Sequence, residues 1–302
     1  MSQRASTRTP ALPLDRLFAA YVVLAGAALL FPNREPGWAL IAALHVAGAA
    51  LLLYASAIIE RVHVFGATTQ RRLRTTLDWA PLLLVPMLYT ELALLNRAVH
   101  GGTYFDDIII RWEQALFGGM PSSDWAAAAP HLWLSEPLHA AYLSYYFIIL
   151  GIPLALALRG RTAEFRKAVF ALMLVFFAHY LFFVYFPVQG PRYLFPPPGG
   201  ELANGYFYQL AHRLLEAGSS QGAAFPSSHV GVSVAQTLIA WRYAPRLMPM
   251  TAILTIGLAL GAVYGGFHYA TDAVAGVILG VAVVLAAPRL YRALGGPSSA
   301  AQ

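Results

Sequence analysis

Long apolar stretches alternate with short polar connections along most of this chain. Several reach about 20 residues, the length that an α-helix needs to cross the hydrocarbon core of a bilayer. The pattern predicts eight helices, at residues 14–31, 38–59, 76–96, 136–158, 164–186, 226–243, 247–264 and 268–288. The first is short and rich in Ala and Gly, so an interfacial helix is the alternative there. We therefore expect an all-α, multi-pass membrane helical bundle.

Composition agrees with this interpretation. The chain has 302 residues, of which 58% are hydrophobic and 11% charged, with a mean hydropathy of +0.58. These values exclude an ordinary soluble domain. The chain has no cysteine, which excludes disulfides and thiolate metal sites. The polar N-terminus and the apolar run after it have features of a signal peptide, but no cleavage site stands out.

The connections between the predicted helices differ in character. Residues 60–75 are basic, whereas residues 97–135 are long, acidic and aromatic and are expected to include a short interfacial helix. Residues 187–225 are rich in Pro and Gly, which predicts a loop before a helix near Leu202–Ala217. The expected organisation is a cytoplasmic tail, N-terminal transmembrane helices, a catalytic membrane domain and a flexible C-terminal tail, at residues 1–13, 14–97, 98–292 and 293–302.

Basic residues are unevenly distributed among these connections, and this sets the predicted orientation. With the N-terminus inside and eight helices, all but five of the 20 Lys and Arg residues fall in cytoplasmic segments. The five on the outer side are Arg34, Arg97, Arg111, Arg192 and Arg213. Seven helices with the N-terminus outside would keep the orientation of the later connections. We expect a cell-membrane protein with both termini cytoplasmic.

Two polar motifs stand at the mouths of the sixth and eighth predicted helices. PSSH occupies residues 226–229 and HYATD occupies residues 268–272. Ionisable groups beside hydrocarbon are costly, so they are candidates for function. The predicted orientation gathers both motifs and the loop of Arg192 at the extracytoplasmic face.

These groups suit phosphoryl transfer through a phosphohistidine. Asp272 lies four residues after His268, where its carboxylate can hold the Nδ1–H of the imidazole and leave Nε2 free as a nucleophile. His229 can protonate the leaving oxygen. Arg192 can give bidentate hydrogen bonds to phosphate oxygens. A metal site at the two histidines would lack a third ligand at helical spacing, so no metal or other cofactor is expected.

Neighbouring residues are candidates for substrate binding. Pro226 suits the first turn of a helix, and Ser227 or Ser228 can be its N-cap, so that the first amides point at a bound phosphate. The YGGF turn at residues 264–267 lets the backbone approach a substrate closely. The tyrosines of residues 141–147 are either packing, an interface belt or a wall for a lipid headgroup.

At these residues the chain resembles the type 2 phosphatidic acid phosphatase (PAP2) superfamily, over about residues 100–290. PSSH is similar to its second motif, P-S-G-H, and His268 and Asp272 have the spacing of its third. The form of the third motif, with Tyr264 and Tyr269 around His268, looks most like the inositol phosphorylceramide synthase branch and its bacterial members. The segments at residues 106–118 and 186–193 also look like that branch. The resemblance implies a PAP2-type core and makes Tyr264 and Tyr269 candidates for substrate binding.

The chain departs from the superfamily pattern in its cations. The first motif is Lys, six residues, Arg-Pro, but here only Pro191-Arg192 stands in a comparable place and no lysine precedes it. The arginine usual six residues before the histidine of the third motif is replaced by Ala262. A phosphate diester carries less charge than a monoester, so fewer cations favour a diester-like substrate. Alternatively, Arg213 or Arg111 folds over the site.

These observations lead to one functional hypothesis and one alternative. The hypothesis is a metal-independent membrane enzyme, either a lipid phosphatase or a phospho-headgroup transferase such as an inositolphosphotransferase. Its expected partners are the bilayer and a phospholipid, polyprenyl phosphate or sphingolipid phosphate, and not a nucleic acid. The alternative is a membrane transporter or non-catalytic protein on the same scaffold, although the Gly/Pro-broken segments in matched halves that are typical of transporters are not evident.

Overall fold

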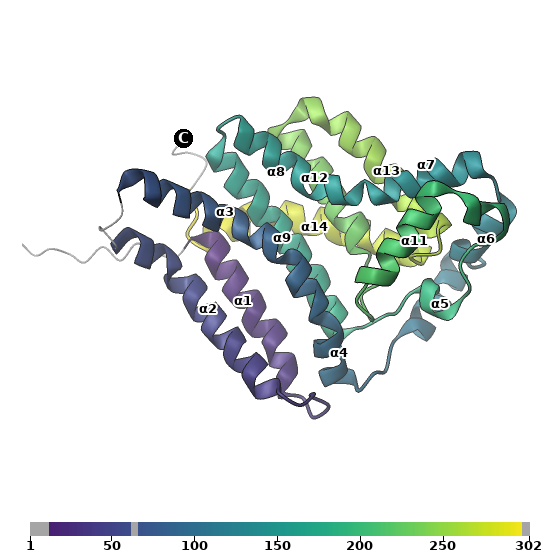
Figure 1. Ribbon diagram of the computed structural model, residues 1–302, viewed down its shortest axis with the longest axis horizontal. Coiled ribbons are helices and arrows are strands. Elements are labelled where there is room, and N and C mark those ends of the chain that lie inside the picture. Colours follow the sequence, from purple (N-terminus) through teal and green to yellow (C-terminus); the bar gives the residue numbers. More distant parts are fainter. Residues whose placement is uncertain (1–11, 62–65, 298–302) are drawn as a thin grey trace, which may run out of the picture.

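The computed structural model of the chain describes residues 12–61 and 66–297, and within these ranges the protein is a bundle of helices (Figure 1). An isolated bridge between Val188 and Ala223 is the only β-structure in the described ranges. The all-α prediction is therefore confirmed. Of the proposed tails at residues 1–13 and 293–302, residues 1–11 and 298–302 lie outside the described residues.

The α-helices and the three 3-10 helices follow in chain order. They are α1 (Pro13–Gly26), η1 (Ala27–Leu30), α2 (Trp38–Arg61), α3 (Ala67–Thr90), α4 (Leu92–His100), α5 (Asp106–Phe117), α6 (Pro121–Ala128), α7 (Leu132–Leu143), α8 (Tyr145–Leu158), α9 (Thr162–Tyr185), α10 (Pro191–Leu194), η2 (Gly200–Asn204), α11 (Tyr206–Gly218), α12 (Ser228–Tyr243), η3 (Pro245–Leu247), α13 (Met248–Tyr264) and α14 (Ala270–Ala293).

Several of these elements are long and apolar enough to cross a membrane. Within the described residues they are Pro13–Leu30, Thr162–Tyr185, Pro245–Tyr264 and Ala270–Ala293. The bent pairs α3–α4 and α7–α8 bring the number to six if each pair is one span. The chain is thus a membrane protein by composition and length, while its eight-span topology stays a prediction. Helix α12 has 16 residues, so it is about 24 Å long and shorter than a typical hydrocarbon core.

Two of the predicted helices are broken. The helix predicted at residues 76–96 starts earlier, within the basic segment expected to be a connection, and bends by 46° at Glu91. The helix predicted at residues 136–158 bends by 45° at Ser144. The Ser144 hydroxyl donates to the carbonyl of Ala141 at 2.6 Å. Such side-chain bonding to the preceding turn bends helices, and periodicity alone does not reveal it.

The starts of α12 and α14 also differ from the prediction. Pro226 precedes α12 instead of lying in its first turn, and Ser227 is the N-cap, with its hydroxyl accepting from the amide of Val230 at 3.4 Å. Helix α14 starts at Ala270, so His268 lies in the turn before the helix and not on its surface.

Helix α9 forms the centre of the bundle. It contacts α1, α3 and α4 on one side and α8, α12 and α14 on the other, as Figure 1 shows. Its side chains are buried over most of its length, because neighbouring helices cover most of its surface. The N-terminal helices therefore pack directly on the helix that supports the rest of the chain.

Hydrogen bonds from two arginines near the start of α9 join helices at one end of the bundle. Arg166 of α9 binds Asp78 of α3 through two nitrogens, at 2.9 and 2.8 Å. Arg161, just before α9, donates to the carbonyl of Tyr243 at the end of α12. The starts of α12 and α14, with both polar motifs, lie at the opposite end of their helices.

Candidate active site

The turn between α13 and α14 presents the first histidine. The Nδ1 atom of His268 lies 3.3 Å from Oδ2 of Asp272, and the same oxygen accepts the backbone N–H of Tyr269 at 3.0 Å. Asp272 is fully buried and occupies the third position of α14. This carboxylate therefore caps the helix and orients the imidazole, so that Nε2 of His268 is the ring nitrogen available for chemistry.

The second histidine lies in the first turn of α12. The ring of His229 packs between Tyr142 and Tyr145, at centroid distances of 5.1 and 4.3 Å. Its Nε2 lies 3.4 Å from the Tyr142 hydroxyl, and its centroid is 5.6 Å from that of His268. Tyr142 and Tyr145, which flank the Ser144 bend, thus pack against His229, and Tyr142 also lines its pocket. A lipid headgroup as the partner of this cluster stays a prediction.

Close packing of α12 on α14 brings the two histidines together. A Cβ on Gly276 would lie 2.5 Å from the carbonyl oxygen of Ser227, and one on Gly280 would lie 2.6 Å from that of Gly231. Neither distance is possible for a real side chain, so only glycine allows the backbones to approach this closely. The amide of Ser227 also donates to the carbonyl of Asp272 at 2.9 Å. The two motifs are therefore joined by backbone contacts.

Arg192 reaches the site from the short helix α10, which follows a loop that α5 holds in place. The loop turns at Gly190, whose φ of 88° favours glycine. The amides of Gln189 and Gly190 both donate to the carboxylate of Asp106 at 2.9 Å. A third donor to this carboxylate is the Tyr269 hydroxyl, at 3.3 Å. Asp106 therefore ties the arginine loop to the turn that carries His268.

A second buried carboxylate of α5 holds the start of α14. Glu113 is fully buried and accepts the amides of Ala270 and Thr271 at 2.9 and 2.8 Å, and the Thr271 hydroxyl at 2.6 Å. Sequence reasoning assigned no role to Asp106 or Glu113. Their spacing of seven residues, with Ile109 between them on the same helical face, was the available signal, because it placed two acids on an apolar face.

His229, His268 and Arg192 line one pocket, whose empty volume is about 340 Å³. The other lining residues are Tyr89, Tyr142, Gln189, Tyr193, Leu215, Ser219, Ser220, Ala223, Ala224 and Phe267. The NH1 nitrogen of Arg192 is buried and has no hydrogen-bond partner. Arg192 is the one cation among the described residues that line this pocket, and its unpartnered nitrogen suits a bound anion.

The remaining predicted site residues surround this pocket without lining it. The hydroxyl of Tyr264 donates to the carbonyl of Ala129 at 2.6 Å, and that of Tyr269 donates to Asp106. Ser227 and Ser228 are buried at the start of α12. The hydroxyl of Ser227 satisfies a helix amide, as an N-cap should. The hydroxyls of Tyr264, Tyr269 and Ser227 therefore already have hydrogen-bond partners within the protein.

The arginines considered as replacements for the missing motif cations do not line the pocket. Arg213 is held by Gln209 of its own helix at 3.3 Å, and Arg111 is exposed on α5. Ala262, at the position usual for an arginine, is fully buried, and its carbonyl accepts the amides of Phe267 and His268 at 3.0 Å. The pocket therefore concentrates less positive charge than the superfamily pattern implies.

The protonation of His268 follows from this environment. Burial and then the nearby guanidinium of Arg192 lower the pKa of His268 to about 4, with a hydrogen bond to the Ala224 carbonyl acting in the opposite direction. The imidazole is consequently neutral at pH 7, which is the form that a nitrogen nucleophile requires.

No group of three or more His, Cys, Asp or Glu side chains that could hold a metal ion occurs in the described part of the chain. Searches of curated proteins and of solved structures each returned no match. The family model described as "PAP2 superfamily" matches residues 107–286, which run from α5 to α14 and include both histidine motifs and Arg192. The chain therefore belongs to the PAP2 superfamily.

Proposed function

We propose that this protein is a membrane enzyme that transfers a phosphoryl or phospho-headgroup from a lipid through a covalent intermediate on His268. Membership of the PAP2 superfamily supports phosphoryl transfer on lipid-like substrates in general. The observation that carries the specific proposal is the shared pocket of His229, His268 and Arg192. Two imidazoles, one held by a carboxylate, and an unpartnered guanidinium are the groups that such a reaction needs.

In the first step, a phosphate of the substrate binds to Arg192, whose buried NH1 nitrogen has no hydrogen-bond partner in the protein. The N-terminal end of α12, which carries His229, adds the positive end of a helix dipole. Nε2 of His268 attacks phosphorus, so that a P–N bond forms while the P–O bond to the leaving group breaks. His229 takes up a proton when the anionic phosphate binds and donates it to the departing oxygen, so that it ends this step neutral. Asp272 holds the Nδ1–H of His268 and stabilises the positive charge that develops on this ring.

In the second step, His229 takes a proton from the acceptor hydroxyl, whose oxygen attacks the phosphorus atom on His268. The P–N bond breaks and His268 returns to its neutral form. Water as acceptor gives a phosphatase, and a second lipid alcohol gives a transferase. The residues are the same in both cases, so the acceptor decides the reaction.

We favour transfer between lipids for two reasons. The pocket offers a single lining cation, which suits the lower charge of a phosphodiester. The pocket also adjoins an open hollow with an empty volume of about 1050 Å³, which includes Thr90, Glu216 and Gln221 and shares Arg192 and Tyr193 with the pocket. A second headgroup has room there beside the first.

We place the site at the extracytoplasmic face. The basic residues 159, 161, 166, 167, 242, 246, 289 and 292 lie near the ends of helices α8, α9, α12 and α14 that are remote from the site. Positive charge marks the cytoplasmic side of membrane proteins, which supports this orientation. A reporter inserted near Gly199 should then read external, and one fused after Arg292 should read cytoplasmic.

The test uses the full-length protein and phospholipids labelled at phosphorus. Labelled protein trapped by rapid denaturation should carry acid-labile, base-stable phosphate, as phosphohistidine does. His268→Gln should abolish the label, whereas the matched control His131→Gln, an exposed histidine outside the site, should retain it. A label that survives His268→Gln would refute the proposed nucleophile.

The acceptor is tested with the same labelled lipids. Adding diacylglycerol- or ceramide-like acceptors should move the label to a new lipid at the expense of water-soluble label, which is inorganic phosphate from a monoester and the phosphorylated headgroup from a diester. Water-soluble label alone, at every acceptor concentration, would rule out the transferase and leave hydrolysis.

A further inference from the structure

A second pocket lies at the far end of the same helices. It is bordered by α9, α12 and α14 and has an empty volume of about 680 Å³. Measured along the helices, Arg242 of α12 is about 21 Å from Ser228, and Arg292 of α14 is about 30 Å from Asp272. The length along α14 matches the thickness of a typical hydrocarbon core, so the second pocket faces the opposite leaflet from the candidate active site.

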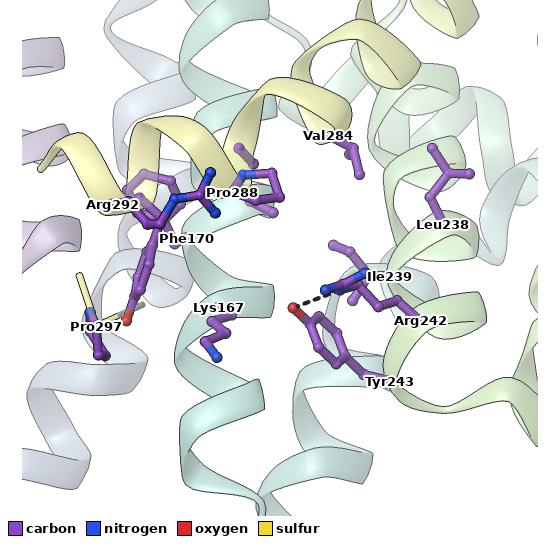
Figure 2. A pocket seen from close by; sticks show the side chains of 13 residues that line it. Lys167, Phe170, Leu238, Ile239, Arg242, Tyr243, Val284, Pro288, Arg292 and Pro297 are labelled. Carbon is purple, nitrogen blue, oxygen red and sulfur yellow. Dashed lines mark hydrogen bonds between the residues drawn. The ribbon is translucent and has the colours of Figure 1, made fainter. Parts of the chain in front are cut away.

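Cationic side chains line one part of this pocket and apolar side chains line another. Lys167, Arg242 and Arg292 come from three different helices, and no Asp or Glu is among the lining residues. Figure 2 shows these cationic side chains around a space that Leu238 and Val284 border on another side. The remaining lining residues are Phe170, Ala171, Ile239, Tyr243, Ala287, Pro288, Tyr291 and Pro297.

One cation has a defined position. Nε of Arg242 donates to the Tyr243 hydroxyl at 3.3 Å, and the guanidinium lies 5.6 Å from the centre of that ring (Figure 2). The contact uses one of the five N–H donors of the guanidinium. The other donors remain available to an anion, and the aromatic ring restricts how the side chain moves.

The surfaces beside the pocket are suited to acyl chains. Trp241 precedes Arg242 and is 66% exposed, and Leu285 follows Val284 and is 65% exposed. Large apolar side chains with this exposure on membrane helices contact lipid, and tryptophan prefers the boundary between headgroups and chains. A molecule in the pocket would therefore have its charged part among the cations and its apolar part along α12 and α14.

We propose that this pocket binds an anionic phospholipid of the leaflet opposite the active site. Its phosphate lies among Lys167, Arg242 and Arg292, and its acyl chains run along the apolar face of α12 and α14. Clusters of basic side chains between transmembrane helices are suited to acidic headgroups, and juxtamembrane cations favour anionic over zwitterionic lipids. The site is separate from the catalytic pocket and needs no assumption about the reaction.

The experiment measures lipid retention by the purified full-length protein in detergent. Phosphatidylglycerol and phosphatidylcholine with identical acyl chains are titrated, and bound lipid is counted by native mass spectrometry. The unaltered protein should hold one phosphatidylglycerol in preference to phosphatidylcholine. Equal retention of the two lipids would overturn the proposal. A third titration with glycerol 3-phosphate distinguishes a lipid from its free headgroup, and its displacement of phosphatidylglycerol at equal concentration would also overturn it.

Two triple variants with the same loss of charge provide the control. The pocket variant is Lys167→Gln/Arg242→Gln/Arg292→Gln, and the matched variant is Arg159→Gln/Arg246→Gln/Arg289→Gln. Each cation near an anionic headgroup contributes about a factor of five in affinity, so the pocket variant should bind phosphatidylglycerol roughly 100-fold more weakly. The matched residues lie in the same region without lining the pocket. An equal loss in both variants would show general charge attraction and refute the site.

Single variants keep the test valid if the triple variants fail to fold. Arg292→Gln and Arg289→Gln alter exposed residues one turn apart on α14, and only Arg292 lines the pocket. Arg292→Gln should weaken phosphatidylglycerol binding about fivefold, and Arg289→Gln should leave it unchanged. The opposite order, or no difference between the two, would contradict the proposal.

Discussion

Glu113→Gln provides the sharpest test of how the site is held. The Glu113 carboxylate accepts three hydrogen bonds, from the amides of Ala270 and Thr271 and from the Thr271 hydroxyl. Glutamine has nearly the same size but replaces one oxygen with an NH2 group, which is a donor. Whichever way the amide is turned, at least one buried donor at the start of α14 then loses its acceptor and faces another donor.

The magnitude follows from these contacts. A hydrogen bond to a charged acceptor contributes about 1.5–3 kcal/mol, and a buried donor without a partner costs a similar amount. We expect a loss of about 3 kcal/mol, concentrated at the first turn of α14, which carries Asp272 and orients His268. If this loss appears mainly as displacement of His268, the rate of phosphoenzyme formation should fall roughly 100-fold.

The assay separates positioning from stability. Phosphoenzyme formation is measured per folded protein, with the thermal midpoint recorded on the same sample. Asp107→Asn is the matched control, because Asp107 is an exposed acid on the same helix. Glu113→Gln should lower the rate and Asp107→Asn should not. A Glu113→Gln protein with a lowered midpoint but an unchanged rate would show that Glu113 supports only the fold.

The remaining predictions concern the two histidines and their helices. Asp272→Asn should keep an acceptor for the Tyr269 amide but lose the negative charge beside His268. We expect phosphoenzyme formation to be about 1000-fold slower at a nearly constant thermal midpoint. A rate within twofold of the unaltered protein would contradict the orienting role of Asp272. Gly276→Val should destabilise the protein by about 3 kcal/mol and reduce activity, because any Cβ there collides with the Ser227 carbonyl. Thermal unfolding measures the effect. An unchanged thermal midpoint would show that α12 and α14 can move apart at little cost in free energy. Because His268 has a pKa of about 4 in the folded protein and 6.5 as its ordinary value, the unfolded chain binds the proton more readily. Its contribution to stability is therefore fully present above pH 6.5 and is lost as the pH falls toward 4. The acid limb of kcat/KM set by this group should lie near pH 4. A kcat/KM that already falls between pH 8 and pH 6.5 would refute the lowered pKa.

Sequence periodicity located the main helices because an apolar stripe of sufficient length specifies a helix whatever its partners. The motifs at residues 226–229 and 268–272 could be placed at one face, since an even number of helix crossings between them returns the chain to the same side. The structure brings His229 and His268 into one pocket, as that reasoning expected. The family resemblance was likewise visible in the motifs themselves.

Other features were not accessible from the sequence for physical reasons. The partners of Glu113 are backbone amides 157 and 158 positions away, and backbone groups carry no residue identity that a pattern can reveal. The bend at Ser144 depends on a hydrogen bond from the Ser144 hydroxyl to a backbone carbonyl of the preceding turn. The position of His268 before α14 depends on where the capping carboxylate of Asp272 ends the turn. In each of these three cases, local conformations of similar free energy compete, and the sequence pattern does not distinguish between them.

The two buried carboxylates of α5 have a geometric consequence. Asp106 holds the loop of Arg192 and Glu113 holds the helix start beside His268, so the seven-residue interval between them, about 10 Å of helix, fixes how far apart the guanidinium and the nucleophile lie. An insertion or deletion of one residue within this interval would shift one anchor by about 1.5 Å and turn it by roughly 100°. Catalysis tolerates no such displacement, so relatives with this chemistry should vary in the loops around α5 but keep the length of the segment between the two acids.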